Sequence, residues 1–380
     1  MLTPRDEAEL SEAIAGASGA LRITGGGTRP SGRTRGEVLS TGHLSGIRLY
    51  EPGALTIVAG AGTPVTEVEE ALAAQNQRLP FEPIDHRRLL EQEGVPTIGG
   101  MVAVNASGPR RIQAGACRDS LIGVRFVDGA GTVIKNGGRV MKNVTGYDLV
   151  KLLAGSWGTL GVMSELSFKV LPGIAATATL RLGGLAAEGA VAAMSAALGS
   201  PYEVSGAAYL PDEGDVILRI EGFEASVAYR AERLSGLLER FGAARTLTDR
   251  AEEASRWRAV RDAAACAPSE GGAGDVWRIS VRPSDGPQVA ERLGSRMRLV
   301  DWGGGLIWAV VPEGQPLRRE LAGIAGHATL LRAAPETHAA LGMFHPEPEA
   351  LAAVSRGLRA RFDPRGILNP GLMDGASAAA

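Results

Sequence analysis

Two glycine-rich segments contain the residue types most able to do chemistry in this chain. The first is Gly25-Gly26-Gly27-Thr28, and the second runs from Gly99 to Gly108. Glycine has no Cβ, so both segments can bring backbone N–H groups close to a flat or highly charged ligand. Consecutive N–H groups in a loop form a concave anion site that suits a pyrophosphate. The first segment lacks the G-x-G-x-x-G spacing and following helix of a Rossmann site, so alone it also fits an ordinary glycine turn.

Short strands and helices must position these loops. The apolar pattern predicts a helix that begins at Thr3, strands over 21–23 and 55–59, and a second helix that begins at Thr63. The order strand, glycine loop, strand, helix is typical of an α+β domain rather than a doubly wound sheet.

The composition changes after Pro172. Alternating strands and Ala/Glu/Arg-rich helices follow, which predicts an antiparallel sheet with helices on one side, a ferredoxin-like cap. We therefore expect a first domain over 1–172, a cap on the substrate side over 173–335, and a C-terminal segment over 336–380 that returns to the first domain. The tail is expected to be disordered from about 374.

The overall composition excludes several classes of protein. The 380 residues have a formal net charge of −2, which gives no electrostatic footprint for nucleic acid. The sequence contains no run of 18 apolar residues, so no membrane span is predicted. The N-terminus lacks the apolar core of a signal peptide. We therefore expect a cytoplasmic protein that meets a membrane only indirectly, at its inner face and through partner subunits.

Metal and cluster chemistry is not expected within this chain. Cys117 and Cys266 are its only cysteines, and two thiols cannot supply the four ligands of an ordinary iron–sulfur cluster. His338 and His345 lie outside the usual spacing of zinc ligands, so no metal site is predicted. A cluster needed for electron transfer would then belong to another protein.

A series of motifs resembles the FAD-binding domain of the vanillyl-alcohol-oxidase-like, PCMH-type flavoproteins. In chain order the motifs are Ile98-Gly-Gly-Met-Val-Ala-Val-Asn-Ala-Ser-Gly108, Gly115-Ala-Cys-Arg-Asp119, Val140-Met-Lys-Asn-Val-Thr-Gly-Tyr-Asp-Leu149, Gly155-Ser-Trp-Gly-Thr-Leu-Gly161, Lys169-Val-Leu-Pro172 and Asp363-Pro-Arg-Gly-Ile-Leu-Asn-Pro-Gly371. Within that family the sequence resembles the FAD-binding E subunits of bacterial glycolate oxidases. The resemblance implies a two-subdomain FAD-binding domain followed by the cap.

The resemblance also implies which residues bind the cofactor. The pyrophosphate would lie on Gly25, Gly26, Gly27 and Thr28. The other residues expected to contact FAD are Pro80, Gly99, Gly100, Ala103, Asn105, Gly108, Arg118, Asp119, Gly161, Val162 and Asn369. Family members with covalent flavin use a histidine near the first glycine loop, where this chain has none. Cys117 fits a small buried filler better than a flavin tether, so non-covalent FAD is expected.

Two residues are candidates for substrate chemistry. Oxidation of a 2-hydroxy acid needs a cation for the carboxylate, a base for the hydroxyl proton and a flavin that accepts the hydride. Trp257-Arg-Ala-Val-Arg261 resembles the Trp-x-x-x-Arg element of hydroxy-acid members, so Arg261 is a candidate carboxylate clamp. It fits a solvated helix arginine equally well. His327 occupies the place of the family's His-rich motif without its acid and second histidine, so a structural role is favoured over that of general base.

The first functional hypothesis is the FAD-binding subunit of a glycolate dehydrogenase complex. Such a complex oxidises glycolate to glyoxylate with a related flavoprotein D subunit and passes electrons to an iron–sulfur F subunit. The alternative is a stand-alone FAD-dependent dehydrogenase of a small 2-hydroxy acid such as lactate, with Arg261 and His327 in the catalytic roles. A third hypothesis, an FAD fold that has lost its cofactor, is opposed by the intact glycine segments.

Overall fold

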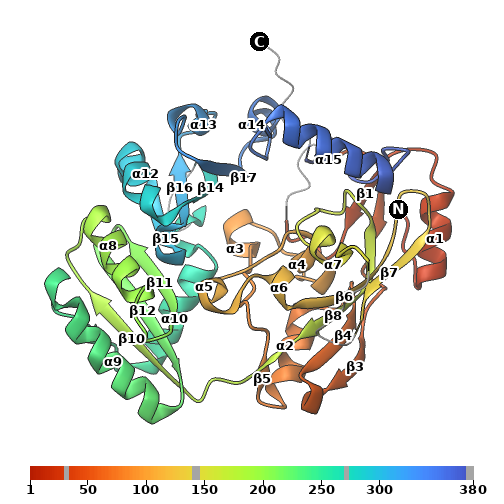
Figure 1. The fold of residues 1–380 in the computed structure, drawn as a ribbon. Coiled ribbons are helices and arrows are strands. Elements are labelled where there is room, and N and C mark those ends of the chain that lie inside the picture. The colour runs from red at the N-terminus through yellow and green to blue at the C-terminus, as the bar shows by residue number, and fades with distance from the viewer. Residues whose placement is uncertain (30–33, 139–145, 269–273, 374–380) are drawn as a thin grey trace.

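The chain folds into two lobes that pack against each other (Figure 1). The computed structural model describes residues 1–29, 34–138, 146–268 and 274–373. The predicted α+β class is confirmed: both lobes combine sheets with helices. Part of the motif over 140–149, the loop over 269–273 and the predicted disordered tail lie outside the described residues.

The first lobe begins with a small parallel sheet of β1 (Leu21–Thr24) and β2 (Glu37–Ser40), covered by α1 (Glu7–Ala15). The prediction that α1 begins at Thr3 is wrong, because Asp6 is its N-cap and accepts the backbone N–H of Glu9 at 2.9 Å. Residues before Asp6 are held extended beside β2, where Leu2 exchanges backbone hydrogen bonds with the strand. That pairing prevents an earlier helix start.

A five-stranded antiparallel sheet forms the rest of this lobe, in the order β3-β4-β8-β6-β7. The strands are Ile47–Glu51, Thr56–Gly60, Val162–Lys169, Leu121–Val127 and Val133–Gly137 in that spatial order. The helix α2 (Val65–Ala73) begins close to the predicted Thr63 and buries Val65, Val68 and Leu72, one face of a 3.6-residue period. The short elements of this lobe are β5 (Gln77–Arg78), α3 (Arg87–Leu90), α4 (Ile98–Ala103), α5 (Arg111–Ala114), α6 (Cys117–Ser120), α7 (Leu149–Leu153) and β9 (Leu171–Pro172).

The second lobe is an eight-stranded antiparallel sheet in the order β13-β10-β12-β11-β15-β16-β14-β17. It consists of two successive βαββαβ units, each with the strand order of a ferredoxin-like fold. The first unit is β10 (Ala176–Leu182), α8 (Ala187–Leu198), β11 (Val204–Leu210), β12 (Asp215–Gly222), α9 (Glu224–Leu238) and β13 (Arg245–Thr246). The second is β14 (Asp275–Val281), α12 (Gly286–Leu293), β15 (Met297–Asp301), β16 (Leu306–Val311), α13 (Leu317–Glu320) and β17 (Gly326–Arg332). The helix α10 (Arg250–Arg261) connects them.

Strand alternation gives the cap sheet two different faces. Trp277 and Ile279 of β14 pack into the core beneath the cap helices. Their neighbour Arg278 lies opposite Trp308 and Thr329 in the sheet register, on the other face. That face meets the first lobe, because Trp308 belongs to the core cluster that spans both lobes.

The C-terminal segment crosses from the cap to the first lobe (Figure 1). After β17 come α14 (Pro335–Leu341) and α15 (Glu349–Phe362). Leu368 then forms a parallel bridge with Leu21, and the backbone N–H of Asn369 bonds to the Leu21 carbonyl at 3.0 Å. No helix of the described ranges is long and apolar enough to cross a membrane.

Candidate active site

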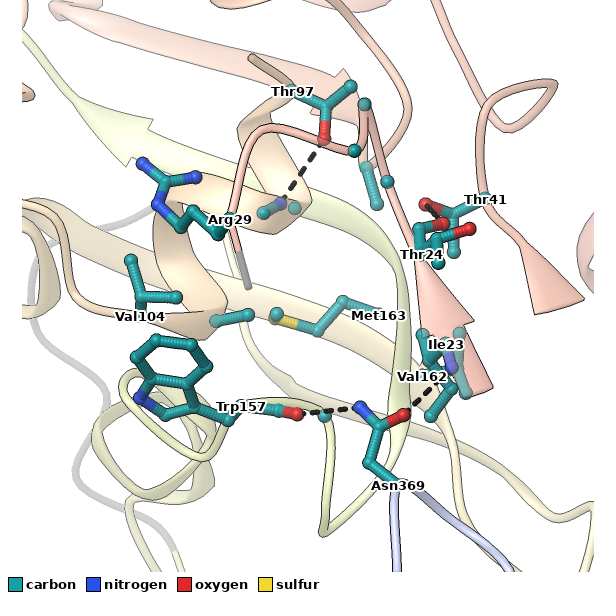
Figure 2. Close-up of a pocket in the computed structure, with 18 of the residues that line it drawn as sticks. Ile23, Thr24, Arg29, Thr41, Thr97, Val104, Trp157, Val162, Met163 and Asn369 are labelled. Atoms are coloured by element: carbon teal, nitrogen blue, oxygen red, sulfur yellow. Dashed lines mark hydrogen bonds between the residues drawn. The ribbon is translucent and has the colours of Figure 1, made fainter. Parts of the chain in front are cut away.

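A cavity of about 280 Å³ lies between β1, the two glycine segments and the C-terminal segment (Figure 2). It brings together most of the residues predicted to hold the cofactor. Those that line it are Gly25, Gly26, Gly27, Thr28, Gly99, Gly100, Ala103, Gly161, Val162 and Asn369.

The first glycine segment enters this cavity at the end of β1. The backbone N–H groups of residues 25–28 make no hydrogen bond to any acceptor that the structure describes, so they are free to meet an anion. A Cβ at Gly26 would lie 1.5 Å from the Val95 carbonyl oxygen. Gly27 has a φ of +70° and open space around its missing Cβ. The segment therefore needs glycine for two reasons, close packing on a neighbouring loop and a left-handed turn.

The second glycine segment forms α4 and packs on β4. A Cβ on Gly99 would lie 2.8 Å from the Ala61 side chain, so Gly99 lets the helix approach the strand. Thr97 is the N-cap and accepts the N–H of Gly100 at 3.3 Å (Figure 2). These contacts hold the bare backbone at Gly100 against the cavity.

Asn369 connects the C-terminal segment to two other walls of the cavity. Its side-chain oxygen accepts the N–H of Ile23 at 2.8 Å, and its side-chain nitrogen donates to the Trp157 carbonyl at 2.8 Å (Figure 2). Trp157 has a φ of +54°, a strained conformation for a bulky residue. The bond from Asn369 thus helps to hold a tryptophan at the cavity edge.

The structure places other predicted cofactor residues away from this cavity. Pro80 is buried and does not line the cavity, and Gly108 packs against Glu82, whose carbonyl oxygen would lie 2.3 Å from a Cβ. The half-exposed side chain of Arg118 lies 3.7 Å from Asp119, whose carboxylate accepts the N–H of Ala116. Asn105 lies at a second cavity instead.

The second cavity, of about 290 Å³, lies between the first lobe and the cap sheet. It shares Arg29, Val104 and Trp157 with the first cavity, so these residues form the boundary between the two. The other polar or aromatic residues that line it are His86, Asn105, Ser107, Arg111, Arg278, Ser280, Trp302, Trp308, His327, Thr329 and Phe344. A volume near the lower end of the roughly 300 to 1,000 Å³ of small-molecule sites suits a small ligand.

Positive charge dominates this second cavity. Burial lowers the pKa of both Arg29 and Arg278 to about 10, which leaves both charged at neutral pH. Arg29 Nε donates to His86 Nδ1 at 3.2 Å. Burial and the charge of Arg29 hold the pKa of His86 well below its usual range, so the ring is neutral with its proton on Nε2.

The two residues predicted to act on substrate lie in different places. His327 lines the second cavity, opposite Ser280 in the sheet register, and burial together with Arg278 lowers its pKa. Arg261 lines neither cavity: its guanidinium makes hydrogen bonds of 2.8 and 2.7 Å to Asp262 at the end of α10. The structure therefore does not bring Arg261 to the site, because a neighbouring carboxylate already holds it.

Sequence reasoning missed four residues of the second cavity: His86, Arg111, Arg278 and Trp302. A signal was present for Arg278, since an arginine inside an otherwise apolar strand indicates a polar face that is not open to solvent. His86 precedes α3, Arg111 is in the four-residue α5 and Trp302 begins a three-residue 3-10 helix, so only the fold brings them together.

Metal and thiol chemistry finds no support in the described part of the chain. No group of three or more His, Cys, Asp or Glu residues there could hold a metal ion. Cys117 is fully buried, and burial raises the pKa of its thiol above its ordinary value.

Comparisons with known proteins agree with this geometry. A family described as an FAD binding domain matches residues 1–137. Glycolate oxidase subunit GlcE of Escherichia coli is 36% identical over 341 residues, 89% of this chain and 87% of that protein. Glycolate oxidase subunit GlcD of Bacillus subtilis is 33% identical over 39% of this chain and 29% of its own length. The solved structure of alkyldihydroxyacetonephosphate synthase has a TM-score of 0.68 at 15% identity, covering 97% of this chain and 76% of that one, which shows the shared fold.

Fold and site together define a PCMH-type flavoprotein. The chain belongs to the vanillyl-alcohol-oxidase-like family of FAD-binding oxidoreductases that includes glycolate oxidase subunit GlcE. Its cofactor is FAD. The unpartnered N–H groups of residues 25–28 and the bare backbone at Gly100 fit such a cofactor, since they present donors and clearance to a flat, charged molecule.

Proposed function

We propose that this chain is the FAD-binding subunit of a glycolate dehydrogenase complex that oxidises glycolate to glyoxylate. The observation that carries the proposal is the adjoining pair of cavities: a glycine-walled one, and a cationic one beyond Trp157. FAD, when bound, supplies a ring that accepts the hydride of an alcohol carbon. The near full-length similarity to GlcE supports the choice of glycolate.

The residues of this chain have assignable tasks in that reaction. The first glycine segment would hold the pyrophosphate, while Gly100, Ala103, Gly161 and Asn369 would surround the rest of the cofactor non-covalently. Guanidinium groups in the second cavity would attract the acid, and the closely packed aromatic side chains there would exclude water. His327 is the candidate to accept the hydroxyl proton, because its lowered pKa keeps the ring neutral.

Electrons would leave to an iron–sulfur F subunit, with a related D subunit in the same complex. The similarity to subunits GlcE and GlcD supports a multi-subunit complex. The F subunit is proposed because the two cysteines of this chain cannot supply the four ligands of an iron–sulfur cluster. Membrane contact would be peripheral and mediated by the partners.

The alternative is a stand-alone dehydrogenase of a 2-hydroxy acid such as lactate. It is supported by one observation, namely that the glycine-walled cavity and the cationic cavity adjoin at Trp157.

The test is a visible spectrum of the purified chain before and after anaerobic addition of glycolate. A flavin spectrum that glycolate bleaches only when the D and F subunits are present supports the complex. Bleaching of the isolated chain by lactate at least as fast as by glycolate supports the alternative. A flavin that neither acid bleaches, alone or in the reconstituted complex, contradicts both.

A further inference from the structure

Two arginines of the second cavity are available to a ligand, in addition to Arg29, which donates to His86. Arg111 comes from α5 in the first lobe and Arg278 from β14 in the cap. Neither makes a hydrogen bond or salt bridge to any residue that the structure describes. The nearby Arg110 and Arg219, by contrast, are both paired with glutamates. A buried charge that is left unpaired is costly, so such a pair indicates an anionic ligand.

Both guanidinium groups are fixed against the same aromatic ring. Arg111 lies 4.5 Å and Arg278 lies 5.2 Å from the centre of the Trp302 ring. The Trp302 indole N–H donates to the Gly108 carbonyl at 3.1 Å, which ties the cap to the first lobe. The ring therefore orients one arginine from each lobe before any ligand arrives.

The backbone at Trp302 is strained, which is typical of a functional position. Its φ is +52°, and Gly303 and Gly304 follow with φ of +66° and +110°. Asp301, whose carboxyl acts electrostatically on Arg278, accepts the N–H of Trp302 at 2.7 Å and forms no salt bridge with either arginine. The Asp301 carboxyl is thus bound to the Trp302 backbone, and both guanidinium groups remain available to a ligand.

We propose that this cavity binds a small carboxylic acid, whose carboxylate is held by Arg111 and Arg278 on the Trp302 platform. The proposal deepens the proposed function and rests on it for the class of acid, a 2-hydroxy or 2-oxo acid. It assigns the carboxylate contact to these two arginines instead of Arg261. It also implies that the flavin of this chain meets such an acid directly, since the cavity adjoins the flavin cavity at Trp157.

The surroundings favour a planar carboxylate over a tetrahedral anion. Trp302 stands beside the arginines, and Trp157 packs edge-on against Phe344 with ring centres 5.3 Å apart. A guanidinium fork matches the two oxygens of a carboxylate in its own plane. His86 and His327 have lowered pKa values from burial and from the arginines, so they offer neutral hydrogen-bonding groups beside the acid.

The test is a titration of the FAD-loaded chain with oxalate, followed by the flavin absorbance and the tryptophan fluorescence. Oxalate has no hydrogen to transfer, so the titration reports binding even if glycolate fails to reduce the flavin. Failure of the proposed function and failure of this site are therefore distinguishable. We expect Arg278→Gln and Arg111→Gln to weaken oxalate roughly 10- to 100-fold each while FAD content is retained.

Three further variants make the result specific. Arg278→Lys should recover only part of the affinity, since an ammonium keeps the charge but not the fork. Arg261→Gln, at the competing position, and Arg282→Gln, at a largely exposed arginine, should bind oxalate like the parent chain. Loss of binding in Arg261→Gln but not in the two cavity variants would overturn the proposal. Equal binding of sulfate through Arg111 and Arg278 would overturn its specificity for a carboxylate.

Discussion

At the scale of single residues, the cofactor cavity depends on backbone without side chains. A Cβ on Gly100 would lie 3.2 Å from Thr97 Oγ1 and 3.5 Å from a nitrogen of the Arg29 guanidinium. The branches of Gly100→Val would then project into the first cavity, where we propose that FAD binds. We expect this variant to fold but to lose most of its FAD, measured as the ratio of flavin to protein absorbance after gel filtration. Gly236→Val is the matched control, because a Cβ there meets nothing within 4 Å. Normal FAD content in Gly100→Val would place the cofactor elsewhere.

The buried Asp301 predicts a dependence of stability on pH. Burial raises the pKa of its carboxyl to about 7, far above the ordinary 3.8. The unfolded chain therefore loses this proton at lower pH than the folded chain. The protonated Asp301 carboxyl thus stabilises the folded state at low pH, and this contribution to the free energy of unfolding is lost as pH rises through 7. Asp301→Asn keeps an oxygen for the Trp302 N–H and removes the titration. Between pH 4 and 8, the free energy of unfolding of this variant should rise relative to that of the parent chain, by at most about 4 kcal/mol.

Denaturant unfolding of both proteins across that pH range measures this difference. Glu349→Asn is the control, because Glu349 is 83% exposed. Its free energy of unfolding should not rise relative to that of the parent chain over this pH range. A difference between Asp301→Asn and the parent chain that stays constant with pH would contradict a raised pKa at Asp301.

At the scale of elements, Asn369 joins the C-terminal segment to β1 and to the turn at Trp157. Asn369→Ala removes both bonds and leaves a partly buried N–H and a partly buried carbonyl without them, at a cost of about 1 to 3 kcal/mol. The alanine must also adopt the left-handed φ of +45°. We expect faster amide exchange over residues 363–373 and weaker FAD binding.

Hydrogen–deuterium exchange with mass spectrometry checks this release of the segment. Asn76→Ala is a suitable control, since Asn76 also has a left-handed φ, of +50°, but is exposed. Unchanged exchange over 363–373 in Asn369→Ala would mean that backbone pairing and the Arg365 side chain hold the segment without the Asn369 side chain.

At the scale of the whole molecule, a buried ion network joins the two lobes. Arg219 of the cap makes two hydrogen bonds to Glu82 of the first lobe, at 3.1 and 2.9 Å. In the reverse sense, Arg110 of the first lobe makes a closest contact of 2.6 Å to Glu221 of the cap. Burial alone would raise the pKa of Glu221, but the bonds from Arg110 and the charge of Arg219 outweigh it and lower the pKa to about 2.

Breaking this network should loosen the lobes. Arg219→Met leaves the two buried carboxylates of Glu82 and Glu221 with Arg110 as their shared partner, and we expect a loss of about 3 to 5 kcal/mol in the free energy of unfolding. Arg256→Met, at a partly exposed pair with Glu213, should cost no more than about 1 kcal/mol. Thermal and urea unfolding of both variants measure the two losses. Equal losses would show that the network between the lobes is no stronger than a surface ion pair.

Local patterns were enough to predict much of this protein. The glycine segments, the strand over 21–23 and the helix from Thr63 are read from short-range spacing, because Cβ sterics and apolar periodicity act within a few residues. The start of α1 was misjudged because Leu2 pairs with β2, a contact that no local signal announces. The doubling of the ferredoxin-like unit in the cap also left no periodic sequence repeat.

The sequence by itself determined the α+β class and singled out the two glycine segments that line the first cavity. Only the tertiary structure decided which arginines face the second cavity. Arg261 has the family's spacing, but the adjacent Asp262 holds its guanidinium. Arg111 and Arg278 are far apart in the sequence, and both lie against the ring of Trp302. The physical reason is that a binding cavity forms where two lobes dock, so its charge depends on long-range packing, whereas a glycine loop depends on its own backbone.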